Sequence, residues 1–391
     1  PVPVVRTEPG GAAPDAQDMK TNGLILMQIR IALAALTFML PAATWAGMAD
    51  ITLPPGFSIQ LFADDVPNAR SMTLGATGVI YVGTRKDDVV YALRDTNGDG
   101  RADRRHVVAR GLDMPNGVVW HDGDLFIAEN ERILRLRDID GRLEDPPEPE
   151  VIYDALPDET HHGWRFIDIG PDGWLYVAIG APCNVCDEGD PFASIARLRP
   201  DGSGFEVYAR GIRNSVGFTW HPKTGELWFT DNGRDWLGDD LPPGELNRAS
   251  AAGQHFGYPY CHGGEVVDPE FGDEGACERY VPPVQPLGPH VAPLGVLFYT
   301  GGMFPAEYRN QVLIAEHGSW NRSQKIGYRV TLVRLDGNRA TDYRPFASGW
   351  LEGQKVRGRP VDLLQLNDGS LLVSDDHADV IYRITYDGPV S

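Results

Sequence analysis

GPDGWLYVAIG, residues 170–180, joins a tight turn to an apolar run that ends at a glycine. A turn of Gly, Pro and Asp followed by such a run is typical of a strand in an antiparallel sheet. The same pattern recurs in five other segments, which are GVIYVGTR (78–85), GDLFIAEN (123–130), GELWFTDNG (225–233), NQVLIAEHG (310–318) and GSLLVSDD (369–376). Six copies of one pattern indicate an internal repeat.

The spacing of these copies predicts the fold. The equivalent positions Ile80, Leu125, Leu175, Leu227, Val312 and Leu371 are successively 45, 50, 52, 85 and 59 residues apart. Several copies are followed by a second alternating run, such as DVVYALRD, which reads as the next strand of a hairpin. Propeller blades have periods of roughly 40 to 50 residues and bury both faces only when neighbours pack around a ring. We therefore predict an all-β, six-bladed β-propeller, because a large β-sandwich would give no reason for six copies.

The first 49 residues differ from the repeat region. We interpret residues 1–26 as an upstream, disordered extension and residues 27–49 as a signal peptide, in which MQIR precedes the apolar run IALAALTFMLPAATWA. That run contains a proline and is shorter than the ~20 residues that span a bilayer. We therefore expect a periplasmic or secreted protein with no membrane span after cleavage. Its propeller domain would cover residues 50–391.

The charge balance excludes one class of partner. The chain has 55 acidic and 35 basic residues, a formal net charge of −20. Nucleic-acid binding proteins neutralise phosphates with Lys and Arg, so a surface of this sign repels a polyanion. We expect no nucleic-acid partner.

The four cysteines fit an oxidising compartment. Cys183 and Cys186 form a CxxC, and Cys261 and Cys277 bracket a Gly-rich, acidic segment within the insert at residues 253–290. Two local disulfides are the simplest of the three pairings. The CxxC lacks the histidine that follows it in c-type haem attachment, and zinc is the lesser alternative.

Loops next to the repeats gather His, Arg and Asn side chains. With the residues that accompany them, the positions in these loops are His161, His162, Arg165, Arg213, Asn214, Asn232, Gly233, Arg234, His290, Glu316, His317, Trp320, Asn321, Arg322, Lys355, Arg357 and Arg359. In a propeller such loops meet at one end of the central channel. Guanidinium groups collected there would form an anion pocket, whereas the alternative is that each arginine pairs with an acidic neighbour. His162 could likewise be a general base or a surface residue.

The segment DTNGDGRAD, residues 95–103, resembles the start of a calcium loop. Asp95, Asn97, Asp99 and Asp103 stand at positions one, three, five and nine, with a glycine at position six. Position twelve is His106 instead of the bidentate acid of an EF-hand. Structural Ca²⁺ and a plain hairpin turn both remain open readings.

Five longer segments resemble a known family. They are HGWRFIDIGPDGWLYVAIG, ARGIRNSVGFTWHPKTGELWFTDNGRD, GELNRASAAGQHFGYPYC, EHGSWNRSQKIGYRV and VRGRPVDLLQLNDGSLLVSDDHADVIYRI. Over residues 50–388 the chain is similar to the soluble quinoprotein sugar dehydrogenases, six-bladed propellers that bind pyrroloquinoline quinone (PQQ) and Ca²⁺. The resemblance implies oxidation of an aldose or related sugar, from hydroxyl to lactone or from aldehyde to acid, with electrons passing to an acceptor that the sequence does not identify.

The resemblance also implies site residues. His162 corresponds to the family's catalytic histidine, which takes the hydroxyl proton as hydride moves to carbon C5 of the quinone. The residues implied at the cofactor are Arg213, Asn214, Arg357 and Arg359, with Arg322 or Lys325 in place of a family lysine. The residues implied at Ca²⁺ are the backbone carbonyls of Gly233 and Arg234, where well-characterised relatives have proline at the second position, and Glu245 and Asp240 at a second calcium.

Two other functions stay open from the sequence. Other six-bladed propellers hydrolyse sugar lactones with a calcium ion at the channel. Such an enzyme would have no trianionic ligand for Arg357 and Arg359 to bind. A propeller can also serve as a glycan- or protein-binding platform without catalysis. Metal and quinone content after reconstitution would separate the three.

Overall fold

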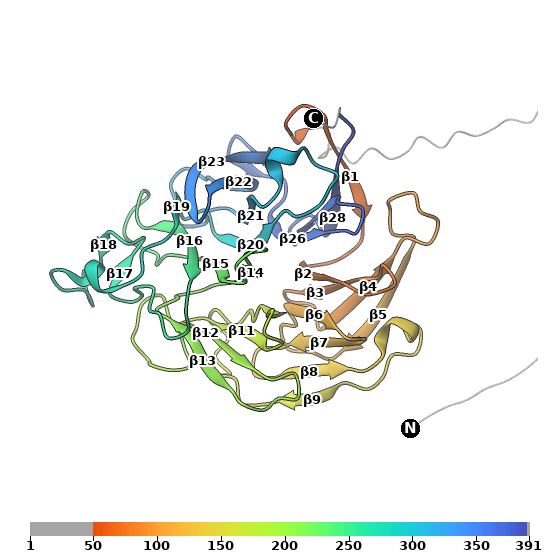
Figure 1. The fold of residues 1–391 in the computed structure, drawn as a ribbon, viewed down its shortest axis with the longest axis horizontal. Coiled ribbons are helices and arrows are strands. Elements are labelled where there is room, and N and C mark those ends of the chain that lie inside the picture. Colours follow the sequence, from red (N-terminus) through yellow and green to blue (C-terminus); the bar gives the residue numbers. More distant parts are fainter. Residues whose placement is uncertain (1–49, 389–391) are drawn as a thin grey trace, which may run out of the picture. The chain divides into compact units, whose positions relative to one another are not determined.

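Six four-stranded antiparallel sheets contain nearly all the regular structure of residues 50–388, the part of the chain that this computed structural model describes. These residues lie in one compact unit, Trp45–Ser391. Figure 1 shows the sheets arranged in a ring, so the predicted six-bladed β-propeller is confirmed. The interpretations of residues 1–26 and 27–49 fall outside the described residues.

Each of the first three blades is built from consecutive strands. Blade 1 contains β2 (Ala69–Leu74), β3 (Ile80–Thr84), β4 (Val89–Arg94) and β5 (Arg104–Arg110). Blade 2 contains β6 (Gly117–His121), β7 (Asp124–Ala128), β8 (Ile133–Leu136) and β9 (Glu150–Tyr153). Blade 3 contains β10 (Ile167–Ile169), β11 (Leu175–Ile179), β12 (Ser194–Leu198) and β13 (Glu206–Arg210).

Of the remaining blades, blade 4 contains an insertion between its third and fourth strands, and blade 6 is completed by the first strand of the described chain. Blade 4 contains β14 (Phe218–Trp220), β15 (Leu227–Asp231), β16 (Pro243–Ala249) and β19 (Gln285–Pro289). Blade 5 contains β20 (Pro293–Phe298), β21 (Val312–Glu316), β22 (Arg329–Asp336) and β23 (Arg339–Ser348). Blade 6 contains β26 (Pro360–Gln365), β27 (Leu371–Asp375), β28 (Val380–Tyr386) and, as its outermost strand, β1 (Phe57–Ala63) from the other end of the described chain.

The six sequence repeats form the second strand of every blade. In β3, β11, β15, β21 and β27 every residue is buried, and in β7 all but the first. Both faces of such a strand are covered by neighbouring blades, which explains why it reads as an unbroken apolar run. Between blades 1 and 2, for example, Tyr81 and Val90 share a cluster with Leu125 and Ile127.

The strand register brings one set of loops to one end of the ring. In four of the six blades the first residue of the inner strand pairs with the last residue of the second strand, as in Ala69 with Thr84 and Pro360 with Asp375. In blades 3 and 4 it pairs two residues before that end, Ile167 with Val177 and Phe218 with Phe229. Residues just before each inner strand and just after each second strand therefore lie at the same end. Inner strands contact one another around the centre, for instance β2 with β6 and β26, so these loops converge there.

Smaller elements lie outside the blades. They are the hairpins β17 (Cys261–His262) with β18 (Val266–Val267) and β24 (Leu351–Glu352) with β25 (Lys355–Val356), and the 3₁₀ turns η2 (Ile139–Gly141), η3 (Ala276–Arg279) and η4 (Ala306–Tyr308). The expected disulfides, Cys183–Cys186 and Cys261–Cys277, are both present. Within residues 50–388 no helix has the length and apolar character needed to cross a bilayer.

Candidate functional site

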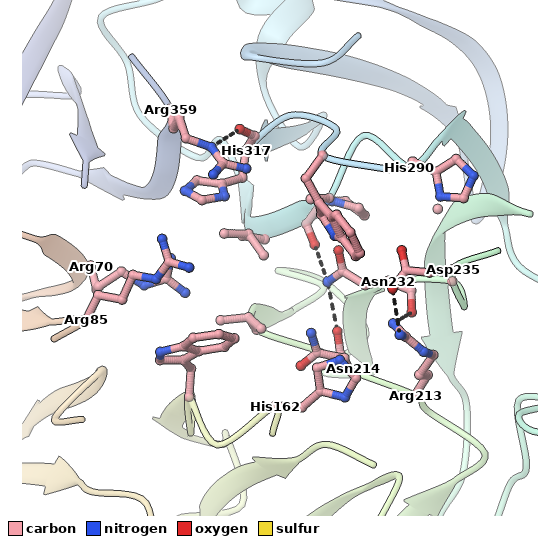
Figure 2. A pocket seen from close by; sticks show the side chains of 18 residues that line it. Arg70, Arg85, His162, Arg213, Asn214, Asn232, Asp235, His290, His317 and Arg359 are labelled. Atoms are coloured by element: carbon pink, nitrogen blue, oxygen red, sulfur yellow. Dashed lines mark hydrogen bonds and ion pairs between the residues drawn. The ribbon is translucent and has the colours of Figure 1, made fainter. Parts of the chain in front are cut away.

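A cavity of about 340 Å³ lies where the loops converge, and its size suits a small ligand. Its lining comes from five blades, and Figure 2 shows the labelled side chains around it. The titratable side chains in the lining are Arg70, Arg85, His162, Arg213, Asp235, His290, His317 and Arg359. Four guanidinium groups thus face one small space in a strongly acidic chain.

His162 enters the cavity from the loop before β10. Its backbone has a φ of 54°, the left-handed region that few residues other than glycine adopt. Gly180, at the end of β11, makes room for it, because a Cβ there would lie 2.5 Å from the His162 Cβ. The imidazole Nδ1 is 2.8 Å from the carbonyl oxygen of Ala181. A carbonyl can only accept, so Nδ1 carries the proton and Nε2 keeps its lone pair.

The surroundings keep this imidazole neutral. Burial lowers the pKa of His162 well below 6.5, and the positive charge of Arg213 lowers it further. The neighbouring His161 is exposed, does not line the cavity, and packs its ring at 61° to that of His162 with a centroid distance of 4.1 Å. Of the two adjacent histidines, His162 is the one that the structure brings to the cavity.

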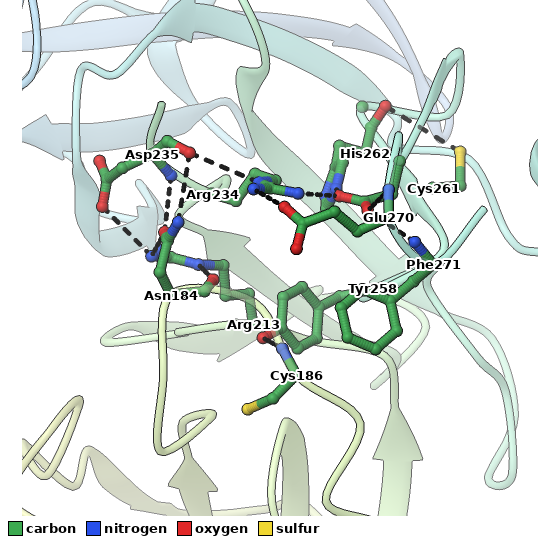
Figure 3. A network of polar contacts seen from close by, with 12 residues as sticks. Asn184, Cys186, Arg213, Arg234, Asp235, Tyr258, Cys261, His262, Glu270 and Phe271 are labelled. Carbon is green, nitrogen blue, oxygen red and sulfur yellow. Dashed lines mark hydrogen bonds and ion pairs between the residues drawn. The ribbon is translucent and has the colours of Figure 1, made fainter. Parts of the chain in front are cut away.

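Arg213 and Asn214 lie at the turn before β14. Both backbone amides donate to the Asp231 carboxylate, at 2.8 and 2.7 Å. The Arg213 guanidinium donates to the backbone and side-chain oxygens of Asn184, at 2.8 and 2.9 Å, and lies 3.4 Å from Asp235 (Figure 3). The CxxC loop that contains Asn184 therefore fixes the orientation of Arg213.

Two arginines of blade 1 and one histidine of blade 5 share one buried carboxylate. Asp376 accepts from Arg70 at 3.1 Å and from His317 Nε2 at 2.7 Å, and Arg85 lies 3.5 Å away. Burial raises the pKa of Asp376, but His317 and the two arginines outweigh it and the pKa is lowered. Burial lowers the pKa of His317 to about 4, so its ring is neutral.

Arg359 reaches the cavity from the loop before β26. Its Nε and Nη2 donate to the carbonyl oxygens of His317 and Gly318, at 3.0 and 2.9 Å. Two further donors of the cavity lining, Arg85 Nε and Trp164 Nε1, are buried without a hydrogen-bond partner within the described residues.

Three basic residues expected at the cofactor lie elsewhere. Arg357, in the loop after β25, forms an ion pair with Glu352 and does not line the cavity. Of the two arginines expected there, Arg357 and Arg359, only Arg359 faces the cavity. Arg322 is 3.2 Å from Asp240. Lys325 donates to the carbonyl of Gln354 at 3.1 Å. Each has an acceptor on its own or a neighbouring loop, which is the alternative that the sequence left open.

The residues expected at calcium are also dispersed. Gly233 lines the cavity, but the Arg234 side chain points to the insert, where it forms a buried ion pair with Asp268 and a second ion pair with the exposed Glu270 (Figure 3). Asp240 is exposed. Residues 50–388 contain no group of three or more His, Cys, Asp or Glu side chains arranged to hold a metal ion.

Glu245 lies on β16, opposite Asp231 on β15. It accepts from Asn247 at 2.8 Å and from the backbone amide of Gly263 at 2.6 Å, and burial raises its pKa. Its contacts tie the disulfide-bonded insert to blade 4, and it does not line the cavity.

The Asp95 loop connects β4 and β5 at the periphery of blade 1. Its side-chain oxygens accept hydrogen bonds from the loop itself, such as Gly98 and Gly100 to Asp95, and Arg101 to Asp99. Asn97 accepts from the Asp99 amide, and Asp103 accepts from Thr96. This local bonding is that of a hairpin turn of Asp, Asn and Gly.

The sequence reasoning missed Arg70 and Arg85 as site residues. A signal for Arg85 exists, because it stands five residues after the repeat position Ile80. The equivalent residues in the other copies are Asn130, Gly180, Asn232, His317 and Asp376. Of these, Asn232 and His317 line the cavity, Gly180 makes room for His162, and Asp376 pairs with Arg70. Asn130 accepts a hydrogen bond from Arg165, which lies outside the lining. No comparable signal marks Arg70.

Comparison with known proteins gives a family and a fold. A family model described as "Domain of unknown function (DUF7133)" matches residues 44–384. An uncharacterized protein of Borreliella burgdorferi is 32% identical over 352 residues, 86% of this chain and 91% of that protein.

Several solved structures have a similar fold, and three of them are named as carbohydrate-active enzymes or sugar dehydrogenases. The holo PQQ domain of pyranose dehydrogenase from Coprinopsis cinerea is 18% identical, with a TM-score of 0.73 over 86% of this chain and 97% of that one. A calcium structure of a Trichoderma reesei carbohydrate-active enzyme of family AA12 is 17% identical, with a TM-score of 0.75 and coverages of 86% and 97%. The PQQ-bound aldose sugar dehydrogenase of Streptomyces coelicolor is 18% identical, with a TM-score of 0.62 and coverages of 85% and 99%. The expected resemblance is confirmed, and at these identities what is shared is the fold.

Proposed function

The chain belongs to the family described as a domain of unknown function (DUF7133), and from its site we propose that it is a PQQ- and Ca²⁺-dependent dehydrogenase that oxidises an aldose or related sugar. One observation carries the proposal. A neutral imidazole, His162, faces the same cavity as four arginines, Arg70, Arg85, Arg213 and Arg359.

The cavity fits a small planar polyanion. PQQ carries three carboxylates, and guanidinium groups bind carboxylates through charge-assisted hydrogen bonds. Among the described residues, the four guanidinium groups form ion pairs with only two carboxylates: Arg70 and Arg85 share Asp376, and Arg213 pairs with Asp235. A lactone hydrolase or a binding platform would leave these groups without a counterpart.

Calcium would be held mainly by backbone oxygens. In the described part of the chain, neither the Gly233 nor the Arg234 carbonyl oxygen accepts a hydrogen bond. Carbonyl oxygens are ligands that Ca²⁺ prefers, and Gly233 lines the cavity. With these carbonyl oxygens as its protein ligands, Ca²⁺ would supply a Lewis acid at the cavity.

In the proposed reaction His162 is the general base. When bound, PQQ supplies the hydride acceptor and Ca²⁺ polarises it. Nε2 of His162 takes the proton of the sugar hydroxyl on the carbon that is oxidised. The bond from Nδ1 to the Ala181 carbonyl fixes the ring and stabilises the positive charge that develops on it. The low pKa lets the imidazole return the proton to solvent after each turnover.

The two disulfides support export. Disulfides persist in the periplasm and outside the cell and are rare in the reducing cytosol. We therefore propose a periplasmic or secreted location.

A reconstitution experiment tests the function. Protein freed of metal and cofactor is titrated with PQQ in the presence of Ca²⁺ by calorimetry, and dye reduction is followed with a panel of aldoses. We expect PQQ binding and aldose-dependent reduction. Absence of both, or Ca²⁺-dependent hydrolysis of sugar lactones without PQQ, would contradict the proposal.

Arg359→Gln and Arg357→Gln form a matched pair for the same titration. Arg359 faces the cavity and Arg357 pairs with Glu352 outside it. A hydrogen bond to a charged group contributes about 1.5 to 3 kcal/mol. Arg359→Gln should therefore weaken PQQ binding ~10- to 100-fold, whereas Arg357→Gln should change it little. If Arg357→Gln weakened PQQ binding more than Arg359→Gln, the assignment of Arg359 as the arginine that binds PQQ would be wrong.

A further inference from the structure

Two tryptophans are exposed side by side at the mouth of the cavity. Trp236, in the loop after β15, is 67% exposed, and Trp320, in the loop after β21, is 63% exposed. Their ring centroids are 5.4 Å apart at an interplanar angle of 85°. We call this pair the tryptophan platform. Exposure of two such large apolar side chains at one place is typical of a binding surface.

The platform is held in place before any ligand binds. The two loops are joined by Asn321 to Asp235 at 3.2 Å, by Arg322 to Asp240 at 3.2 Å and by the Ser323 amide to Asp239 at 3.0 Å. Trp236 has a φ of 73°, a left-handed conformation that costs energy for a bulky residue. Strain of this kind persists where surrounding contacts fix the backbone, often at ligand-binding positions.

The platform continues directly from the cavity. A surface hollow of about 460 Å³ is lined by both tryptophans together with Asp239, Asn321, Arg322 and Ser323. Trp320 lines this hollow and the cavity alike. A ligand that is seated in the cavity and extends outward would therefore pass over Trp320 towards Trp236.

We propose that the platform binds the next residues of a neutral sugar chain whose terminal residue occupies the cavity. The C–H face of a sugar ring packs against the electron-rich face of an indole, and its hydroxyls hydrogen-bond with neighbouring polar groups. The hollow offers both, since Asp239, Asn321 and Ser323 lie beside the two rings. A wholly apolar partner would leave these polar groups buried without water. The formal charge of −20 disfavours an anionic polysaccharide. That a sugar occupies the cavity rests on the proposed function.

Calorimetric titration of the full-length protein without PQQ tests the platform by itself. The probes are cellotetraose, maltotetraose and glucose. We expect at least one tetrasaccharide to bind more tightly than glucose. Trp236→Ala should weaken that binding ~3- to 10-fold, the range of one aromatic contact, and Trp236→Phe should retain most of it. Phe271→Ala, which removes an exposed aromatic ring of the insert, is the control and should leave it unchanged.

Kinetics of the reconstituted protein separate failure of the platform from failure of the proposed dehydrogenase. Trp236→Ala should lower kcat/KM for the preferred tetrasaccharide by the same factor and leave that for glucose unchanged. If no aldose is oxidised but a tetrasaccharide binds in a manner dependent on Trp236, the platform stands and the dehydrogenase does not. Equal affinities of parent and Trp236→Ala for both tetrasaccharides would overturn the inference. It would also be overturned if Trp236→Ala lowered kcat/KM only when a protein served as the electron acceptor.

Discussion

The adjacent histidines 161 and 162 differ in what surrounds their rings. The His162 ring is fixed by a hydrogen bond to Ala181 and fits against Gly180, whereas His161 is exposed. Substitution of Gly180 by any other residue would place a Cβ 2.5 Å from that of His162. A general base needs a fixed orientation and a free lone pair, and only His162 meets both requirements.

His162→Ala should retain PQQ binding and lose turnover ~10²- to 10⁴-fold, the usual contribution of a general base. The measurement is dye reduction by the reconstituted variant, beside calorimetric PQQ titration. His161→Ala is the matched control, because it removes the neighbouring imidazole and leaves the bond to Ala181 intact. A greater loss of turnover in His161→Ala than in His162→Ala would show that the assignment is wrong by one residue.

His317 gives a prediction about pH. Its pKa in the folded protein is lowered to about 4 by burial, whereas an unfolded chain binds this proton near pH 6.5. Between these values the unfolded chain holds more protons, so the free energy of unfolding falls as pH falls, by at most ~1.4 kcal/mol per pH unit for one group. Asp376, whose pKa is lowered, adds its loss only at lower pH.

Urea unfolding at pH 7, 6, 5 and 4.5 measures this dependence. Other buried histidines contribute with the same sign, so the informative quantity is the difference between variants. His317→Gln should show a shallower loss of stability between pH 6.5 and 4 than the parent. His377→Gln, which changes an exposed histidine, should follow the parent. Parallel curves for His317→Gln and the parent would contradict the assignment.

Part of the candidate site was predictable from sequence, for a physical reason. His162, Arg213, Asn214, Gly233 and Arg359 stand in loops next to repeat strands, and the repeat dictates that such loops meet. What the repeat does not encode is the direction of a side chain within its loop. Arg357 and Arg359 are two residues apart, yet one pairs with Glu352 and the other enters the cavity.

Among the strands, the second strand of every blade was predictable because both of its faces are buried. Outer strands are different, since one edge and much of their surface face water. In β9 (Glu150–Tyr153), for example, no residue is fully buried. The pairing of β1 with β28 was also out of reach, because it joins segments more than 300 residues apart, Phe57 with Tyr386 and Ala63 with Ile381.

The two disulfides should have different effects when removed. The cysteines of Cys183–Cys186 are three positions apart in the sequence, and those of Cys261–Cys277 are sixteen positions apart. Chain-entropy estimates give about 2 and about 3 kcal/mol of stabilisation. The shorter bridge, however, shapes the loop in which Asn184 holds Arg213. We expect Cys183→Ser/Cys186→Ser to weaken PQQ binding ~10-fold, through the lost orientation of a charged donor.

Cys261→Ser/Cys277→Ser is the matched variant for that measurement. It should lower the free energy of unfolding more and change PQQ affinity less, because its bridge holds the insert and no residue of the cavity lining. Calorimetry and urea unfolding on both variants give the two quantities. If removal of Cys261–Cys277 weakened PQQ binding more than removal of Cys183–Cys186, the proposed effect of the shorter disulfide on PQQ affinity through Asn184 would be wrong.

The ring as a whole is closed by one strand from the other end of the described chain. β1 completes blade 6, and its first residue, Phe57, also reaches blade 5. The Phe57 ring meets Phe304, Tyr308 and Phe346 at centroid distances of 4.8, 5.3 and 5.1 Å. It is 4.9 Å from Tyr386 on β28. Because the cavity is lined by five blades, its geometry depends on this closure.

Phe57→Ala tests that dependence. Loss of a phenylalanine packed among four rings should reduce the free energy of unfolding by about 3 kcal/mol, near the lower end for Phe→Ala in cores because Phe57 is only partly buried. The control Phe271→Ala removes an exposed ring and should have little effect. If the ring unfolds cooperatively, urea curves followed by tryptophan fluorescence and by circular dichroism should shift together, and PQQ affinity should fall only as the folded fraction does. Separate transitions, with PQQ binding retained after the first, would mean that the cavity survives an open ring and that closure by β1 serves blade 6 alone.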